Sequence, residues 1–116
     1  MNRFLLALIS LCGICGCKKA DVPLPMPPEA KLIDVRSREE YTAGHLAGAV
    51  WIPHGEISRE IAGVAPDLSI PVYLYCRSGR RSGIAKEALT QKGYVNVYNL
   101  GGIGDAARIL QLPLEK

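Results

Sequence analysis

Short apolar runs alternate with segments of helical periodicity through most of this chain, and this alternation constrains its fold more than any other feature. The apolar runs have the length and composition of buried strands and occupy residues 31–35, 49–52, 72–75 and 94–98. Helical segments follow them at 37–43, 55–64, 82–92 and 104–110. Because the links between them are short, the pattern predicts a single α/β domain whose parallel β-sheet carries helices on both faces.

One cysteine lies where this fold class binds its ligands. Cys76 directly follows the run 72–75 and precedes the helix that Ser82 is expected to cap. In parallel sheets, ligands bind outside the carboxyl ends of the strands, near the N-terminus of a helix. Another helix start is marked by Ser37 and Glu40, whose spacing is that of a capping box. We therefore place the chemistry of the chain at Cys76.

The loop from Cys76 to Ser82 has the composition of an anion site. Its backbone N–H groups can curl around a bound anion, and Gly79 relieves the steric limits on that curl. These N–H groups and the following helix N-terminus stabilise a thiolate, so we expect the pKa of Cys76 to lie below that of a free thiol. The residues expected to bind an anionic substrate are Arg77, Ser78, Gly79, Arg80, Arg81 and Ser82.

A thiolate in such a loop can act as a nucleophile toward sulfur. We expect Cys76 to attack a sulfane sulfur and sulfite to leave, after which cyanide or a thiol removes the sulfur from the cysteine. The simpler interpretation is that Cys76 is a small buried hydrophobic residue. The glycine and arginines directly after it favour a reactive cysteine.

Three motifs in this sequence resemble signatures of the rhodanese family. The loop Cys76-Arg77-Ser78-Gly79-Arg80-Arg81-Ser82 is similar to the active-site loop of that family. The upstream motif consists of Ile33-Asp34-Val35-Arg36, Glu39, Tyr41, Gly44-His45-Leu46 and Gly48-Ala49. The closing segment consists of Tyr98, Asn99, Leu100 and Gly101-Gly102. The resemblance covers about residues 30–110 and is strongest to single-domain periplasmic rhodaneses of the phage shock protein E type.

The resemblance implies an activity and roles for individual residues. It implies a thiosulfate sulfurtransferase in which Cys76 forms a persulfide and the donor is a small anion, thiosulfate or a persulfide. Arg80 stands where periplasmic relatives also have an arginine, so it is the strongest candidate for binding substrate charge. Asp34 and Arg36 match positions that support the site from the first strand.

Two other functions remain open at this level. Related phosphatases and arsenate reductases also hold an oxyanion over a cysteine, in a loop of the form Cys-x5-Arg. Only four residues separate Cys76 from Arg81, so this pattern fails by one position. The other alternative is a non-turnover sulfur carrier or redox-sensing binding module, because the same persulfide chemistry serves both roles.

The N-terminus has the features of an export signal. Arg3 precedes an apolar stretch over residues 4–16, which is typical of a signal peptide spanning residues 1–17. Ile14-Cys15-Gly16-Cys17 resembles a lipobox, which implies lipidation of Cys17 and anchoring on the periplasmic side of a bacterial membrane. In a Gram-negative host, the absence of Asp after that cysteine favours the outer membrane. Cleavage near Ala20 is the alternative and predicts a soluble periplasmic protein.

The remaining composition sets the domain boundaries and excludes several partners. Residues 18–29 contain four prolines and are predicted to form an extended tether, which leaves residues 30–114 for the domain. The formal charge of +3 comes without a basic stripe, so we expect no nucleic-acid partner. Cys12, Cys15 and Cys17 lie in the targeting segment, so we expect no metal site. The sequence has no phosphate-binding loop, and we expect no cofactor.

Overall fold

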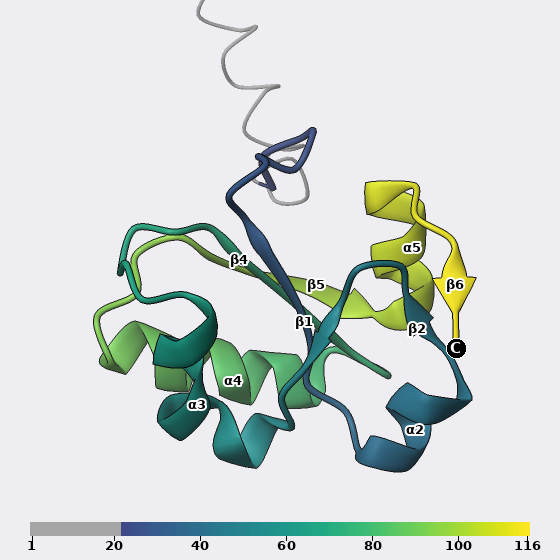
Figure 1. The fold of residues 1–116 in the computed structure, drawn as a ribbon, viewed down its shortest axis with the longest axis horizontal. Helices are drawn as coiled ribbons and strands as arrows, with labels where there is room; N and C mark the ends of the chain where they lie inside the picture. The colour runs from purple at the N-terminus through teal and green to yellow at the C-terminus, as the bar shows by residue number, and fades with distance from the viewer. Residues whose placement is uncertain (1–21) are drawn as a thin grey trace, which may run out of the picture.

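Four parallel strands form the sheet at the centre of the computed structural model, which describes residues 22–116 (Figure 1). Their order across the sheet is β3-β1-β4-β5. The strands are β1 (Lys31–Asp34), β3 (Val50–Trp51), β4 (Val72–Cys76) and β5 (Val97–Gly102). A parallel arrangement requires crossover connections between the strands, and the helices supply them. The predicted parallel α/β sheet is confirmed.

The register of the strands brings three chain segments to one edge of the sheet. Asp34 at the end of β1 lies opposite Tyr75 of β4, and Cys76 lies opposite Gly102 of β5. The pairing of β4 with β5 is irregular between Leu74 and Cys76. The carboxyl ends of β1, β4 and β5 therefore surround the cysteine.

Helices cover the sheet on both faces, as the sequence predicts. The helices are α2 (Arg38–Ala43), α3 (Ile57–Val64), α4 (Arg80–Gln91) and α5 (Ile103–Leu110), and a 3-10 turn, η1, spans His54–Glu56. Figure 1 shows α3 and α4 side by side against one side of the sheet and α5 on the other. The capping box at the start of α2 is present, with Ser37 and Glu40 bonding each other's backbone as predicted.

Successive side chains of the central strands point to opposite faces of the sheet, which divides the core into two clusters. From β4, Val72, Leu74 and Cys76 join a cluster that includes α3 and α4, whereas Tyr73 and Tyr75 join one that includes α5. Both tyrosines are fully buried. Burying one large apolar side chain is worth about 1.5–3 kcal/mol, so these alternating contacts hold β4, and with it Cys76, in a fixed position.

Several element boundaries differ from those predicted, and two of the differences lie at the ends of α4. Helix α4 begins at Arg80 with Gly79 as its N-cap, so Ser82 does not cap it but lies inside its first turn. Gly79 adopts φ +98°, a left-handed conformation that glycine reaches without a Cβ penalty. Strand β5 begins at Val97 instead of Tyr94, because the N–H of Tyr94 donates to the carbonyl of Leu89 at the end of α4.

A second, two-stranded sheet was not predicted. It pairs β2 (His45–Leu46) with β6 (Leu114–Glu115) in antiparallel fashion. Figure 1 shows the C-terminal strand β6 beside β2. Strands of two residues carry no periodic pattern, so only the fold brings them together.

Residues 22–29, which the sequence analysis assigned to an extended tether, pack against the domain. The hydroxyl of Tyr73 donates to the carbonyl of Pro23 at 2.6 Å, and Val22 and Met26 pack on the α5 side of the core. The predicted signal peptide, Cys17 and the first residues of the tether lie outside the described residues. Within residues 22–116, no helix is long and apolar enough to span a bilayer.

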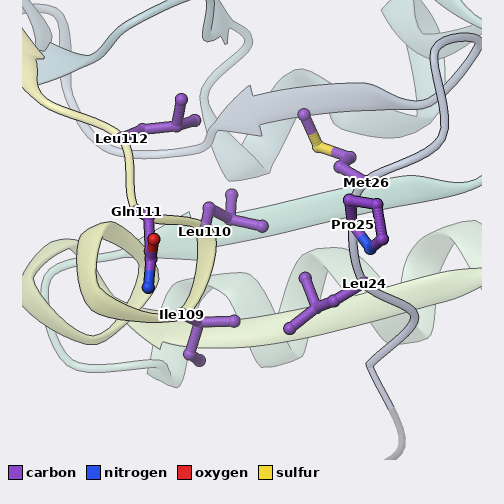
Figure 2. Close-up of a pocket in the computed structure, with 7 residues that line it drawn as sticks. All are labelled: Leu24, Pro25, Met26, Ile109, Leu110, Gln111 and Leu112. Atoms are coloured by element: carbon purple, nitrogen blue, oxygen red, sulfur yellow. The ribbon is translucent and has the colours of Figure 1, made fainter.

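An apolar cavity of about 480 Å³ lies where this N-terminal segment meets the end of α5. Figure 2 shows that its walls come from two stretches of chain, residues 24–26 and residues 109–112. The lining side chains are Leu24, Pro25, Met26, Ile109, Leu110, Gln111 and Leu112. None of them is titratable or nucleophilic, so we assign no chemistry to this cavity.

Candidate active site

The thiol of Cys76 lies at the base of the loop that joins β4 to α4. The residue is buried, because its strand is one of the two inner strands and has a neighbouring strand on each side. The backbone N–H of Gly79 donates to its Sγ at 3.0 Å, and the hydroxyl of Ser82 lies 3.5 Å from the same sulfur. The loop thus curls around the sulfur as the sequence predicts.

The environment of Cys76 favours its thiolate form. Burial opposes ionisation, but hydrogen bonds from the Ser82 hydroxyl and from the backbone of Ser82, Ser78 and Gly79 outweigh it. They lower the pKa of Cys76 from its ordinary 9.0 to about 7. The N-terminus of α4, which begins four residues after the cysteine, adds a partial positive charge on the same side. Near neutral pH, much of the thiol is therefore available as a nucleophile.

Glu40 of α2 holds one of the three loop arginines. Its carboxylate accepts from Arg81 at 2.7 Å and 3.1 Å, and the same carboxylate completes the capping box with Ser37. The hydrogen bond from Arg81 is the main reason that the pKa of Glu40 falls to about 2. The pair joins the first turn of α2 to the first turn of α4. Arg81 was predicted to bind substrate, and in the structure its guanidinium donates to Glu40.

The other two loop arginines are exposed. Arg77 is 75% exposed, and its guanidinium lies 3.9 Å from Glu40, too far for a hydrogen bond. Arg80 is exposed on the first turn of α4. Both guanidinium groups are thus free of the close pairing that holds Arg81, and both can reach an anion from solvent.

Asp34 and Arg36 form a buried ion pair at the end of β1. Arg36 donates to both oxygens of Asp34 at 2.7–3.0 Å and also to the carbonyl of Gly44 at 2.6 Å. The guanidinium carbon lies 5.7 Å from the centre of the Tyr75 ring, in the strand that carries Cys76. The pair therefore connects β1, the end of α2 and β4, consistent with a supporting position beside the site.

Asn99 of β5 contacts the loop from the opposite side. Its Oδ1 accepts from the Ser82 hydroxyl at 2.7 Å and from the N–H of Gly101 at 2.9 Å, while its Nδ2 donates to the carbonyl of Gly79 at 3.1 Å. Neighbouring Gly102 lies so close to the loop that a Cβ there would stand 2.4 Å from the Arg77 carbonyl oxygen. The Asn99 side chain thus contacts two of the residues that donate to the sulfur, Gly79 and Ser82.

Sequence reasoning did not identify Glu40 and Asn99 as parts of the site. Glu40 is 41 residues from Arg81, and Asn99 is 17 residues from Ser82, so no local pattern links either pair. One usable signal was the position of Asn99 directly after the strand expected over residues 94–98, in the same parallel sheet as the strand before Cys76. Polar residues near the ends of neighbouring parallel strands meet at the same edge.

A cavity of about 610 Å³ borders the loop on the β5 side. Ser78 and Gly79 of the loop, Asn99 and Gly101 of β5, and Asp105 and Arg108 of α5 contribute polar groups to its walls. Among residues 22–116, no group of three His, Cys, Asp or Glu side chains could hold a metal ion.

Comparison with known proteins gives consistent matches. The family described as Rhodanese-like domain matches residues 22–105. Thiosulfate sulfurtransferase PspE of Escherichia coli (strain K12) is 44% identical over 84 residues, covering 72% of this chain and 81% of the relative. Thiosulfate sulfurtransferase GlpE of Pseudomonas fluorescens (strain SBW25) is 36% identical over 73 residues, covering 63% of this chain and 65% of the relative.

A solved structure described as a rhodanese with anions from E. coli has a similar fold. It superimposes with a TM-score of 0.69 at 42% sequence identity, and the match covers 75% of this chain and 98% of that one.

Proposed function

The chain belongs to the rhodanese-like domain family and is a sulfurtransferase, and we propose that it transfers the sulfane sulfur of thiosulfate to cyanide or a thiol through a persulfide on Cys76. The observation that carries this proposal is the buried thiol with a pKa near 7, held among hydrogen-bond donors at the end of β4. A buried, unreactive cysteine would have its pKa raised instead. The relatives named thiosulfate sulfurtransferase support the choice of donor.

The reaction proceeds in two displacement steps. The Cys76 thiolate attacks the sulfane sulfur of thiosulfate, the S–S bond of the donor breaks, and sulfite leaves with the bonding electrons. The terminal sulfur of the resulting persulfide carries negative charge beside the loop N–H groups. The acceptor then attacks that sulfur, and the Cys76 thiolate leaves with the electron pair. Cyanide becomes thiocyanate, and a thiolate becomes a new persulfide.

The polar groups at the loop have different roles in binding the donor. Arg80 and Arg77 attract the dianion from solvent, because their guanidinium groups are exposed. The backbone of Ser78 and Gly79 and the hydroxyl of Ser82 stabilise charge on sulfur. Arg81 holds α4 against α2 through Glu40, and Asp34 and Arg36 keep the end of β1 in place.

The cavity beside the loop supports an acceptor larger than cyanide. Its volume of about 610 Å³ is in the range of small-molecule binding pockets, and Ser78 and Gly79 form part of its wall. We expect a small thiol to approach the persulfide from this side.

Intact mass spectrometry tests the proposal. The reduced protein is incubated with thiosulfate, and its mass should increase by one sulfur atom, which is lost again on adding cyanide or a thiol. Cys76→Ser should show no gain at this site and should lose transfer activity by a factor of at least about a thousand. A gain that no acceptor removes would identify a sulfur carrier. A full gain in Cys76→Ser would disprove the assignment of the nucleophile.

We also propose that the protein is exported and carries a lipid on Cys17. The basic, then apolar N-terminus and the lipobox-like residues before Cys17 support this proposal. Replacing Cys17 by Ser should move the protein from the membrane fraction to the soluble periplasmic fraction. An unchanged distribution between the fractions would contradict the lipid anchor.

A further inference from the structure

The hydroxyl of Ser82 has two acceptors within reach and one proton to give. It lies 2.7 Å from Oδ1 of Asn99 and 3.5 Å from Sγ of Cys76. The residue is fully buried, so bulk water does not compete for that proton. A serine hydroxyl donates a single hydrogen bond, and Ser82 therefore serves only one of the two partners at a time.

The orientation of the Asn99 amide is set by backbone groups of known polarity. The N–H of Gly101 donates at 2.9 Å, so the atom that it contacts must be the amide oxygen. The carbonyl of Gly79 accepts at 3.1 Å, so the atom facing it must be the amide nitrogen. Turning the amide over would place two donors together and two acceptors together. Asn99 thus presents an acceptor to Ser82, and Ser82 is the donor in that bond.

The charge of the sulfur determines whether the Ser82 hydroxyl donates to Asn99 or to Cys76. A thiol sulfur is a weak acceptor, so the amide oxygen at 2.7 Å keeps the proton while Cys76 is neutral. A hydrogen bond to an ionised acceptor is about twice as strong as one between neutral groups, so an anionic sulfur draws the proton toward itself. Asn99 is exposed, and water can replace the hydrogen bond that its oxygen gives up.

We propose that Asn99 is a positioning residue, which accepts the Ser82 hydroxyl proton while Cys76 is a thiol and yields it when the sulfur becomes a thiolate or persulfide. The change needs only a rotation of the hydroxyl about the Cβ–Oγ bond of Ser82. Asn99 keeps its contact with Gly79, whose N–H remains on the sulfur throughout. This deepens the proposed function, since the sulfur concerned is the one that we propose to carry the persulfide.

A double-mutant cycle on the full chain tests the proposal. Wild type, Ser82→Ala, Asn99→Ala and the double variant are alkylated with iodoacetamide over a range of pH, and mass spectrometry follows the peptide that contains Cys76. Ser82→Ala should raise the pKa of Cys76, because the thiolate loses a donor. Asn99→Ala should lower it, because the competing acceptor is gone, with a change of roughly three- to tenfold in the ionisation constant. In the Ser82→Ala background, the lowering by Asn99→Ala should disappear.

The cycle separates this role from simple bracing of the loop. If Asn99 only braces Gly79, both single variants raise the pKa of Cys76, and Asn99→Ala has the same effect with or without Ser82. That outcome would overturn the proposal. The charged groups around the site are unchanged in all four proteins and cancel from the cycle: Asp34, Arg36, Glu40, Arg77, Arg80, Arg81 and Asp105.

The test does not depend on the folding of one variant or on the proposed sulfur donor. Asn99→Val suits a strand position, and it replaces Asn99→Ala if that variant does not fold. No sulfur donor is used, so the cycle gives its answer even if thiosulfate is not the substrate. Failure of the proposed function would appear in the sulfur-transfer experiment and leave the coupling between Ser82 and Asn99 unchanged.

Discussion

Cys76 lies between two flanks of opposite chemical character. The charged flank, on the side of β1 and α2, consists of Asp34, Arg36, Glu40 and Arg81. The neutral flank, on the side of β5, consists of Gly79, Ser82, Asn99 and Gly102. The hydrogen bonds to the sulfur come from the neutral flank, at 3.0 Å from Gly79 and 3.5 Å from Ser82. The charged flank connects structural elements to one another.

The difference has a physical reason. In the proposed cycle the sulfur alternates between thiol, thiolate and persulfide, so it needs donors whose hydrogen bonds can adjust to its charge at small cost. Dipoles such as backbone N–H groups and hydroxyls meet this need, whereas a buried ion pair to the sulfur would leave an unpaired charge whenever the sulfur is neutral. On the charged flank each cation already has its partner, so those groups can stay fixed through the cycle.

The neutral flank should show the larger response to substitution. In Gly102→Ala, the new Cβ would lie 2.4 Å from the Arg77 carbonyl oxygen, and a backbone atom cannot move aside without displacing the loop. We expect a loss of about 2–4 kcal/mol in the free energy of unfolding, measured by urea denaturation, together with a rise in the pKa of Cys76.

Gly104→Ala provides the matched control. This residue lies in α5, and a Cβ there meets no atom within 4 Å. Alanine favours a helix over glycine by about 1 kcal/mol, so this variant should be as stable as wild type or slightly more stable. Equal behaviour of the two variants would show that the close approach of β5 to the loop does not matter.

The contribution of the charged flank to the free energy of unfolding should depend on pH. Glu40→Gln removes the charge that holds Arg81 and should lower the free energy of unfolding at pH 7 by about 1–2 kcal/mol. Because the pKa of Glu40 is lowered in the folded state, from 4.5 to about 2, its contribution is complete above pH 4.5. That contribution is lost as the pH falls toward 2. The difference between wild type and variant should therefore shrink between pH 4.5 and pH 2, as measured by urea denaturation at each pH.

Glu39→Gln removes the same charge from an exposed residue in the same helical turn. Its effect on stability should stay within about 0.5 kcal/mol at every pH. A pH-independent difference for Glu40→Gln would mean that packing, not charge, is responsible for the effect at Glu40.

The smallest effect should come from Arg80, one of the two exposed loop arginines outside both flanks. Arg80→Ala removes charge but no reacting atom, so the KM for thiosulfate should rise about five- to tenfold with a smaller change in kcat. The difference should diminish at high ionic strength. Lys86→Ala, which removes a charge from the exposed side of the same helix, should leave the KM within about twofold. Equal changes in both variants would show that net charge, and not the position of Arg80, attracts the donor.

Much of the fold and part of the site followed from sequence patterns. Residues 31–35 and 72–75 form adjacent buried strands because both are short and mostly apolar, and the capping box at Ser37 rests on residues three apart. The position of Cys76 at a strand end and the curl permitted by Gly79 are also local properties. The start of α4 was misplaced because serine is a common N-cap, while here a left-handed glycine takes that position.

Local sequence patterns therefore determined the strands of the central sheet, most of the helices, the position of Cys76 and the glycine that lets the loop turn around it. The tertiary structure decided what surrounds the sulfur. Parallel pairing of β4 with β5 brings Asn99 to Ser82, and packing of α2 beside α4 brings Glu40 to Arg81. Two of the three loop arginines face solvent and the third is paired for the same reason. These contacts join residues far apart in the chain, and a hydrogen bond or ion pair between them depends on distances that only the packed fold sets.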